Sequence, residues 1–308
     1  MTATTARSVF GFAVDTTIPL AFTRAGDASE RLHIDVAPAE SLAHEGDVVY
    51  EWKFKDPTGD VSARLHRVGT AYYLWTADTC WFRIEPAARR ITLPAEGDEA
   101  RREVRLWGVP TTLCSVERGD VSLHASVVEI DGGAVLFAAP GQYGKTTLAL
   151  AFHQCGYRVL SEDVACCQVG PRPILFPGPA SLRVRPDMFG GTAPSGTQVI
   201  AAQPDRVFLR IDDDRAGTGD AVPIRAIVFL RRSENEIRLE RLKAIRSLPD
   251  LWSLSFRVPG SVASAQLFEG LSQLAARVTL WNLHRPLRPD NLEAVVACIA
   301  SAPLATPG

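Results

Sequence analysis

One short loop constrains this chain more than any other feature of its sequence: Ala139-Pro140-Gly141-Gln142-Tyr143-Gly144-Lys145-Thr146. It lies between an apolar segment, 134–138, and an Ala/Leu-rich segment, 145–155, which predict a strand and a helix. A bound phosphate needs inward main-chain N–H groups, a helix N-terminus, a lysine and a magnesium-binding hydroxyl. The loop therefore predicts phosphate binding, although Ala139 replaces the first glycine of the pattern; the alternative is an ordinary glycine-rich turn. The residues predicted to bind nucleotide are Pro140, Gly141, Gln142, Tyr143, Gly144, Lys145, Thr146 and Thr147.

The elements around this loop have the order of a nucleotide-binding α/β unit. Their pattern predicts strands over 121–130, 134–138 and 158–160, a turn at 131–133, and a helix over 145–155 that Gly156 ends. A weaker helical pattern over 100–118 precedes them, with Pro110 suited to a first helical turn. Further along, we predict strands over 221–230 and 278–283 and helices over 261–277 and 291–300.

The first hundred residues have the chemistry of strands. Apolar residues alternate or form short runs there, separated by Gly, Asp and Pro. This spacing predicts an antiparallel sheet with one face in water. The predicted strands are 9–14, 32–36, 48–54, 72–75 and 80–84.

Composition excludes several classes of protein. With 46% hydrophobic and 22% charged residues among 308, the chain should bury a sizeable core, and it fits neither a disordered nor a fibrous protein. A formal charge of −2 gives no basic field that would attract nucleic acid or a membrane surface. The N-terminus has no apolar signal segment, so we predict a cytoplasmic protein. The six cysteines lack metal-binding spacing and are expected to be reduced core thiols.

Two further groups are candidates for chemistry beside a bound phosphate. Glu162 and Asp163 closely follow the predicted strand 158–160, and ligands bind at such carboxyl ends in open α/β sheets. A carboxylate there can hold a metal ion or accept the proton of an attacking hydroxyl, whereas the alternative is a solvated acidic turn. His124 lies on the predicted strand 121–130. From its spacing alone, a core or turn histidine is the commoner interpretation.

Three separated segments, 121–126, the loop through Thr146, and 156–163, together resemble the catalytic region of HPr kinase/phosphorylase. They are most similar to the HPr-kinase-like proteins of bacterial peptide (lasso-peptide type) biosynthetic clusters. His124 stands 21 positions before Lys145 and Asp163 stands 18 after it, in the register of that family. The resemblance is strong over 121–169 and weaker over 177–187 and 277–286.

The resemblance implies catalytic roles for Asp163, Glu162, His124 and Lys145. It makes Asp163 the proton acceptor and Glu162 the first acid of the pair, and it implies magnesium ligation by Thr146, Glu162 and Asp163. Glu162 departs from the family's Asp-Asp pair and moves its carboxylate outward by one methylene. The family's later acid and arginine are not placed by the sequence. The candidates for them are Asp187, Arg183 and Arg206.

The resemblance also implies an α/β fold (α+β overall), with a P-loop kinase core of HPr-kinase type over 101–308 after a β-rich N-terminal domain over 1–100. It implies an enzyme that uses ATP and Mg²⁺ to phosphorylate a hydroxyl, without an efficient reverse reaction. We expect the acceptor to be a Ser or Thr of a peptide or small protein. A small-molecule hydroxyl kinase and a catalytically inactive nucleotide-binding regulator are the alternatives. No nucleic-acid or membrane partner is expected, and a homo-oligomer stays open.

Overall fold

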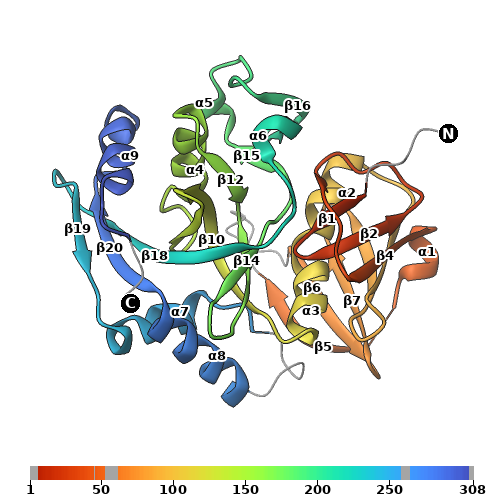
Figure 1. The fold of residues 1–308 in the computed structure, drawn as a ribbon. Coiled ribbons are helices and arrows are strands. Elements are labelled where there is room, and N and C mark those ends of the chain that lie inside the picture. Colours follow the sequence, from red (N-terminus) through yellow and green to blue (C-terminus); the bar gives the residue numbers. More distant parts are fainter. Residues whose placement is uncertain (1–5, 45, 53–61, 258–263, 305–308) are drawn as a thin grey trace.

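The computed structural model describes residues 6–44, 46–52, 62–257 and 264–304. Over these residues the chain is a mixed α/β structure dominated by three sheets. Figure 1 shows the N-terminal sheet beside a central sheet that has helices on both faces. Parts of two predicted elements, 53–54 and 261–263, lie outside the described residues. Within the described ranges, no helix is both long enough and apolar enough to cross a membrane.

The N-terminal sheet has the strand order β3-β1-β2-β4-β9-β8-β7-β6-β5. Most neighbours are antiparallel, but β4 runs parallel to both β2 and β9. The prediction of a purely antiparallel sheet is therefore wrong, because β4 is inserted between two strands that no hairpin connects to it. The strands are β1 (Arg7–Val9), β2 (Phe12–Thr16), β3 (Arg24–Ala25), β4 (Glu30–Ala37), β5 (Asp47–Trp52), β6 (Ala63–Val68), β7 (Ala71–Thr76), β8 (Cys80–Glu85) and β9 (Arg90–Pro94).

The segment 9–14, predicted as one strand, contains a hairpin turn instead. Phe10 and Gly11 join β1 to β2 and both have positive φ, 52° and 74°, as a two-residue hairpin requires. A phenylalanine rarely adopts this conformation. Here its side chain is buried, its N–H donates to Pro177 O at 2.7 Å, and its carbonyl accepts from Arg118 at 2.7 Å. Tertiary contacts therefore override the local pattern.

The central sheet contains the strand that leads into the glycine loop. β10 (Val121–Ile130), β11 (Gly133–Ala138) and β12 (Arg158–Ser161) confirm the strands predicted there. β11 runs parallel to β18 (Val222–Arg232), and β18 runs parallel to β20 (Thr279–Arg285). β10 runs antiparallel to β11, β12 and β13. The remaining strands are β13 (Val164–Gln168), β14 (Ile174–Phe176) and β19 (Arg238–Arg241).

Helices cover both faces of this sheet because its apolar side chains alternate between them. In β11, Val135 and Phe137 pack on one face, whereas Leu136 packs on the other. The first face is covered by α4 (Lys145–Gln154) and α9 (Leu292–Ala300), and the second by α7 (Ala244–Leu254) and α8 (Ser264–Arg277) (Figure 1).

Two helices, α2 (Glu99–Leu106) and α3 (Val109–Glu117), replace the single helix predicted over 100–118. Gly108 separates them with non-helical torsion angles, φ −86° and ψ −122°. Residues of both helices share one hydrophobic cluster with the N-terminal sheet and with Val164 and Cys166 of β13. Packing is therefore continuous across residue 100, where the sequence predicts a domain boundary.

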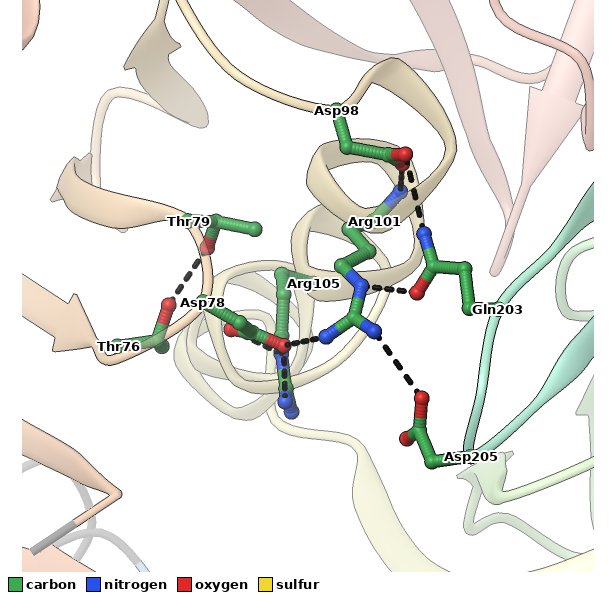
Figure 2. A network of polar contacts seen from close by, with 8 residues as sticks. All are labelled: Thr76, Asp78, Thr79, Asp98, Arg101, Arg105, Gln203 and Asp205. Carbon is green, nitrogen blue, oxygen red and sulfur yellow. Dashed lines mark hydrogen bonds and ion pairs between the residues drawn. The ribbon is translucent and has the colours of Figure 1, made fainter.

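A small sheet is attached to the N-terminal region through a polar network on α2. Its strands are β15 (Ser181–Val184), β17 (Val207–Ile211) and β16 (Thr197–Ala202). Arg101 donates to Asp205 in the β16–β17 turn at 3.0 Å, and Arg105 donates to Asp78 in the β7–β8 turn at 2.8 Å. Figure 2 shows how α2 thereby joins two turns that are distant in sequence. The network consists of Thr76, Asp78, Thr79, Asp98, Arg101, Arg105, Gln203 and Asp205.

All six cysteines are free, but not all are core residues. Cys80 and Cys155 are exposed, contrary to the prediction, because the first begins β8 and the second follows the end of α4. The remaining short helices are α1 (Ala39–Leu42), α5 (Pro186–Phe189), α6 (Asp213–Ala216) and a 3-10 turn at Pro289–Asn291.

Candidate functional site

The glycine loop between β11 and α4 rests on a buried arginine that the sequence pattern does not reveal. Gly144 is the N-cap of α4 and has φ 75°, and Gln142 also has positive φ, 67°. A Cβ on Gly144 would lie 2.5 Å from Arg285 Nη2, so a larger residue would displace this support. Arg285 is 2% exposed and donates to the carbonyls of Tyr143 (3.1 Å) and Gly144 (3.2 Å). Because Arg285 is buried, these hydrogen bonds hold the loop in place before α4. The unpaired N–H groups of the first turn of α4 can then bind an anion.

Lys145, at the start of α4, points into the loop. Its Nζ donates to the carbonyls of Ala139 (2.8 Å) and Pro140 (3.0 Å) and contacts His124 Nε2 at 2.9 Å. Burial lowers the pKa of this lysine to about 8, with Arg183 acting in the same direction and two carboxylates opposing it. A phosphate would give the ammonium anionic partners in place of neutral carbonyls, which strengthens its hydrogen bonds.

His124 connects the lysine to the acidic pair. It lies on β10, and its Nδ1 is 3.3 Å from Asp163 Oδ1. Because the Lys145 ammonium donates to Nε2, the proton of a neutral imidazole lies on Nδ1, facing the carboxylate. Burial, aided by Lys145 and Arg183, lowers the pKa of His124, so the neutral form dominates at physiological pH. The structure thus brings together three side chains that the sequence separates.

The two acids lie in the tight turn between β12 and β13. Thr146 Oγ1 donates to Glu162 Oε1 at 2.5 Å, which links the first turn of α4 to this turn. Glu162 is 5% exposed, whereas the Asp163 side chain is 42% exposed. Desolvation would raise the pKa of Asp163, but the charge and hydrogen bond of Arg183, together with the charge of Lys145, outweigh it and lower the pKa to about 2. Asp163 is therefore ionised and accessible, and Glu162 is enclosed.

Arg183 bridges the acids from the small sheet. On β15, its Nε donates to Glu162 Oε2 and its Nη2 pairs with Asp163 Oδ2, both at 2.8 Å. Burial opposes the charge, yet the two carboxylates raise the pKa of Arg183 above its ordinary value. Of the three candidates for the missing acid and arginine, only Arg183 reaches the site. Asp187 pairs with Arg185 on the surface (3.2 Å), and Arg206 donates to the Asp205 carbonyl (2.8 Å).

A second arginine, missed in the sequence, holds the strand that leads to the acids. Arg24 of β3 is fully buried and binds five main-chain carbonyls, and no carboxylate in the described part of the chain pairs with it. Two of these carbonyls belong to Val159 (2.8 Å) and Leu160 (3.1 Å), directly before the acidic turn. Burial, with the nearby charge of Arg158, lowers the pKa of Arg24 to about 9, so it remains charged at neutral pH. No local pattern marks this residue.

The N-terminal region also contributes to a small cavity beside the acids. This cavity of about 40 Å³ is lined by Glu162, Asp163 and Arg183. Phe10 and Trp107 also line it. Residues on either side of the predicted boundary at 100 therefore form the surroundings of Asp163.

The donor set at this site fits a magnesium ion bound together with phosphate. Thr146 and Glu162 present hard oxygen atoms in contact, and Asp163 lies next in sequence. Among the described residues, no three His, Cys, Asp or Glu side chains converge as a complete metal cage. Mg²⁺ does not need one, because it commonly takes one or two carboxylates and completes its shell with substrate phosphate and water.

The other predicted nucleotide ligands occupy the rim of the loop. Pro140, Gly141 and Gln142 are exposed, while Tyr143 and Thr147 are half-buried. The Tyr143 ring lies 4.8 Å from the guanidinium of Arg232, a residue that the sequence analysis did not single out. This arrangement leaves the outer face of the loop accessible.

Comparison with known proteins adds little to this geometry. No family model matches the chain, and no curated protein matches it. Among solved structures, it is similar to the Hpr(Ser) kinase/phosphatase from Coxiella burnetii, with 15% identity and a TM-score of 0.30 over 58% of this chain and 95% of that one. So distant a similarity does not establish a family, and the function has to be inferred from the site itself.

Proposed function

We propose that the protein is an ATP- and Mg²⁺-dependent phosphotransferase acting on a hydroxyl group. The observation that carries this proposal is the connected set of side chains in which Lys145 contacts His124, His124 faces Asp163, and Arg183 ties Asp163 to Glu162 and hence to Thr146. A phosphate-binding loop, an oxygen pair for magnesium and an exposed carboxylate are the parts that phosphoryl transfer requires.

Each residue has a role set by its position. Lys145 binds the β- and γ-phosphate oxygens, and Thr146 with Glu162 would hold the Mg²⁺, which neutralises charge on those oxygens. The acceptor oxygen forms a bond to the γ-phosphorus while the bond from that phosphorus to the β,γ-bridging oxygen breaks, and ADP leaves. Asp163 takes the hydroxyl proton. His124 orients Asp163 through the proton on Nδ1, and Arg183 holds both acids in place by pairing with each of them.

The acceptor in this proposal is a Ser or Thr hydroxyl of a peptide or small protein. The supporting observation is that Asp163 keeps 42% of its side chain exposed at a wall formed partly by the N-terminal region. A small-molecule alcohol remains the second candidate, because the chemistry at Asp163 is the same. A nucleotide-binding regulator without catalysis is the third, since Glu162 is longer than the Asp of the resembling family.

Two variants test the proposal. Lys145→Ala should weaken ATP–Mg²⁺ binding by roughly 10- to 100-fold in calorimetry, because a charge-assisted phosphate contact is lost. Lys243→Ala, which removes an exposed lysine, is the matched control.

Asp163→Asn should keep ATP binding while phosphoryl transfer falls roughly 10²- to 10⁴-fold. Equal ATP affinity in wild type and Lys145→Ala would refute the nucleotide site, and an active Asp163→Asn would move the proton acceptor elsewhere.

A further inference from the structure

A groove of about 1030 Å³ lies outside the site described above. It is lined by the edge strand β5, by α3, by the start of β10, by the end of α7 and the residues after it, and by α8. Figure 1 shows α7 and α8 on one side of this region and β5 with α3 on the other. The groove therefore lies where the N-terminal sheet meets the helices below the central sheet.

One residue that lines the groove also contacts the candidate active site. Phe256, which lines the groove, sets its ring edge-on to the His124 ring with 6.4 Å between centroids. Its N–H donates to Ser122 O at 2.9 Å, and Ser255 forms a β-bridge with Leu123. This wall of the groove is thus fastened to β10, the strand that carries His124. Phe256 therefore stands between the groove and His124, which faces Asp163.

The side chains lining the groove suit a polypeptide more than a small metabolite. Tyr50, Trp52 and Trp252 present aromatic surface, and Tyr50 is 46% exposed. The volume is at the upper end of the range of about 300–1,000 Å³ typical of small-molecule sites. In addition, β5 ends its sheet and pairs only with β6 among the described residues, so its outer main-chain groups can pair with an extended chain.

Charge further restricts the occupant. Glu117 and Glu269 line the groove, and Arg257 is the one basic residue among its described lining. Asp120, also on the wall, is already paired with Arg118 at 2.5 Å. Arg257 lies over the Trp252 ring at 5.0 Å, where the aromatic face already stabilises its charge. The groove consequently favours a ligand that carries positive charge beside apolar side chains.

We propose that this groove binds the segment flanking the acceptor hydroxyl of an extended peptide, with a Lys or Arg opposite Glu117 and Glu269 and a large apolar residue against Trp252. The inference rests on the proposed phosphotransferase function and names the substrate class for the same site. Transfer itself proceeds as described above, with the hydroxyl delivered past Phe256 to Asp163. Pairing of β5 with a second copy of this chain is the competing use of the edge.

The test uses the full chain and a positional-scanning library of peptides with a central Ser and randomised flanking residues. With ATP and Mg²⁺, the wild type should select a basic and a large apolar position on one side of the Ser. For the best peptide, Trp252→Ala should raise KM at least about tenfold with kcat and ATP affinity nearly unchanged, because an aromatic anchor is lost. Glu269→Gln should weaken the selection for the basic residue. Ile245→Ala, an exposed change on the same helix as Trp252, should leave KM unchanged.

The outcomes separate this inference from the proposed function. If Trp252→Ala transferred phosphate to peptides with an unaltered KM, the proposed role of the groove in peptide binding would be overturned. The proposed phosphotransferase function would stand. Direct binding of the selected peptide to Asp163→Asn, measured by fluorescence anisotropy and lost in Trp252→Ala, would support the groove even where transfer is abolished. A wild-type library profile without flanking preference, or a dimer in sedimentation that Tyr50→Arg dissociates, would overturn it.

Discussion

Two arginines hold the acids and the strand that leads to them, and they act in different ways. Arg24 comes from the N-terminal sheet and, among the described residues, binds only main-chain carbonyls. Arg183 comes from the small sheet and binds only the two carboxylates among the contacts described for it. Burial lowers the pKa of the first to about 9, whereas the carboxylates raise the pKa of the second despite its burial.

The two sets of contacts differ in whether they affect the charge of the acids. Carbonyls carry only partial charge, so Arg24 fixes the path of β12 without changing the charge of the acids. Arg183 offsets two adjacent negative charges, which would otherwise repel each other and raise the pKa of Asp163. We therefore expect Arg24 to contribute mainly to stability and Arg183 mainly to activity. The predictions that follow test this division.

Among the variants that compare the two arginines, the largest expected effect is that of Arg183→Leu on phosphoryl transfer. Without the guanidinium, Glu162 and Asp163 lose their shared partner, and transfer should fall roughly 10²- to 10³-fold. Arg183→Lys should recover only part of the rate, because a lysine cannot bridge two carboxylates in the same fork-like geometry. Single-turnover transfer from labelled ATP measures both. A rate unchanged in Arg183→Leu would show that the acids keep their places without it.

The second prediction concerns stability. Arg24→Met leaves several buried carbonyls without a donor and should lower the free energy of unfolding by about 3 kcal/mol in chemical denaturation. At a temperature where the variant is folded, its transfer rate should stay within about threefold of wild type. This corresponds to a change of less than about 1 kcal/mol in the activation free energy. Arg89→Met, which removes a half-exposed arginine, is the control. If transfer fell as far as in Arg183→Leu, Arg24 would have to be counted among the residues that position the acids.

The same contrast explains what the sequence could predict. The loop, β10, β11 and α4 follow from local features: alternating apolar residues, a glycine-rich turn and an Ala/Leu-rich run. Lys145, Thr146, Glu162 and Asp163 are marked by their places relative to these elements. The sequence gives the spacing of these residues along the chain. The structure adds that His124 contacts Lys145 and faces Asp163.

The supporting arginines could not be predicted in the same way. Arg24 and Arg285 come from β3 and β20, and nothing near them in sequence distinguishes them from surface charges, while the sequence offers Arg183, on β15, only as one of three candidates. Their importance arises only when the sheets pack and bury them against carbonyls or carboxylates. The Phe10–Gly11 turn was missed for a related reason, since its positive φ is stabilised by contacts with Pro177 and Arg118.

The smallest effect predicted is at Glu103, which secures the segment just before Arg24. Glu103 is 4% exposed and accepts hydrogen bonds from the N–H groups of Ala21 (2.6 Å) and Phe22 (2.7 Å) and from Trp107 Nε1 (3.0 Å). At acidic pH the protonated carboxyl of Glu103 keeps a hydroxyl oxygen that can accept a hydrogen bond, whereas Glu103→Gln places an NH₂ donor there, so one N–H loses its acceptor. We expect the free energy of unfolding to fall by about 1–2 kcal/mol at acidic pH, with little change in transfer.

The pH dependence gives this prediction a sharper test. Burial outweighs the three donors and raises the pKa of Glu103 above its ordinary value of 4.5. The folded state therefore binds the proton more tightly than the unfolded state, and the stability from this group is complete below 4.5 and is lost as pH rises through the folded pKa. Glutamine cannot titrate, so the stability gap between wild type and Glu103→Gln should narrow as pH rises through that interval. Chemical denaturation of both proteins from acidic to neutral pH measures this difference in the free energy of unfolding. If the difference widened as pH rises, the N–H groups around Glu103 would stabilise its ionised form, contrary to the prediction.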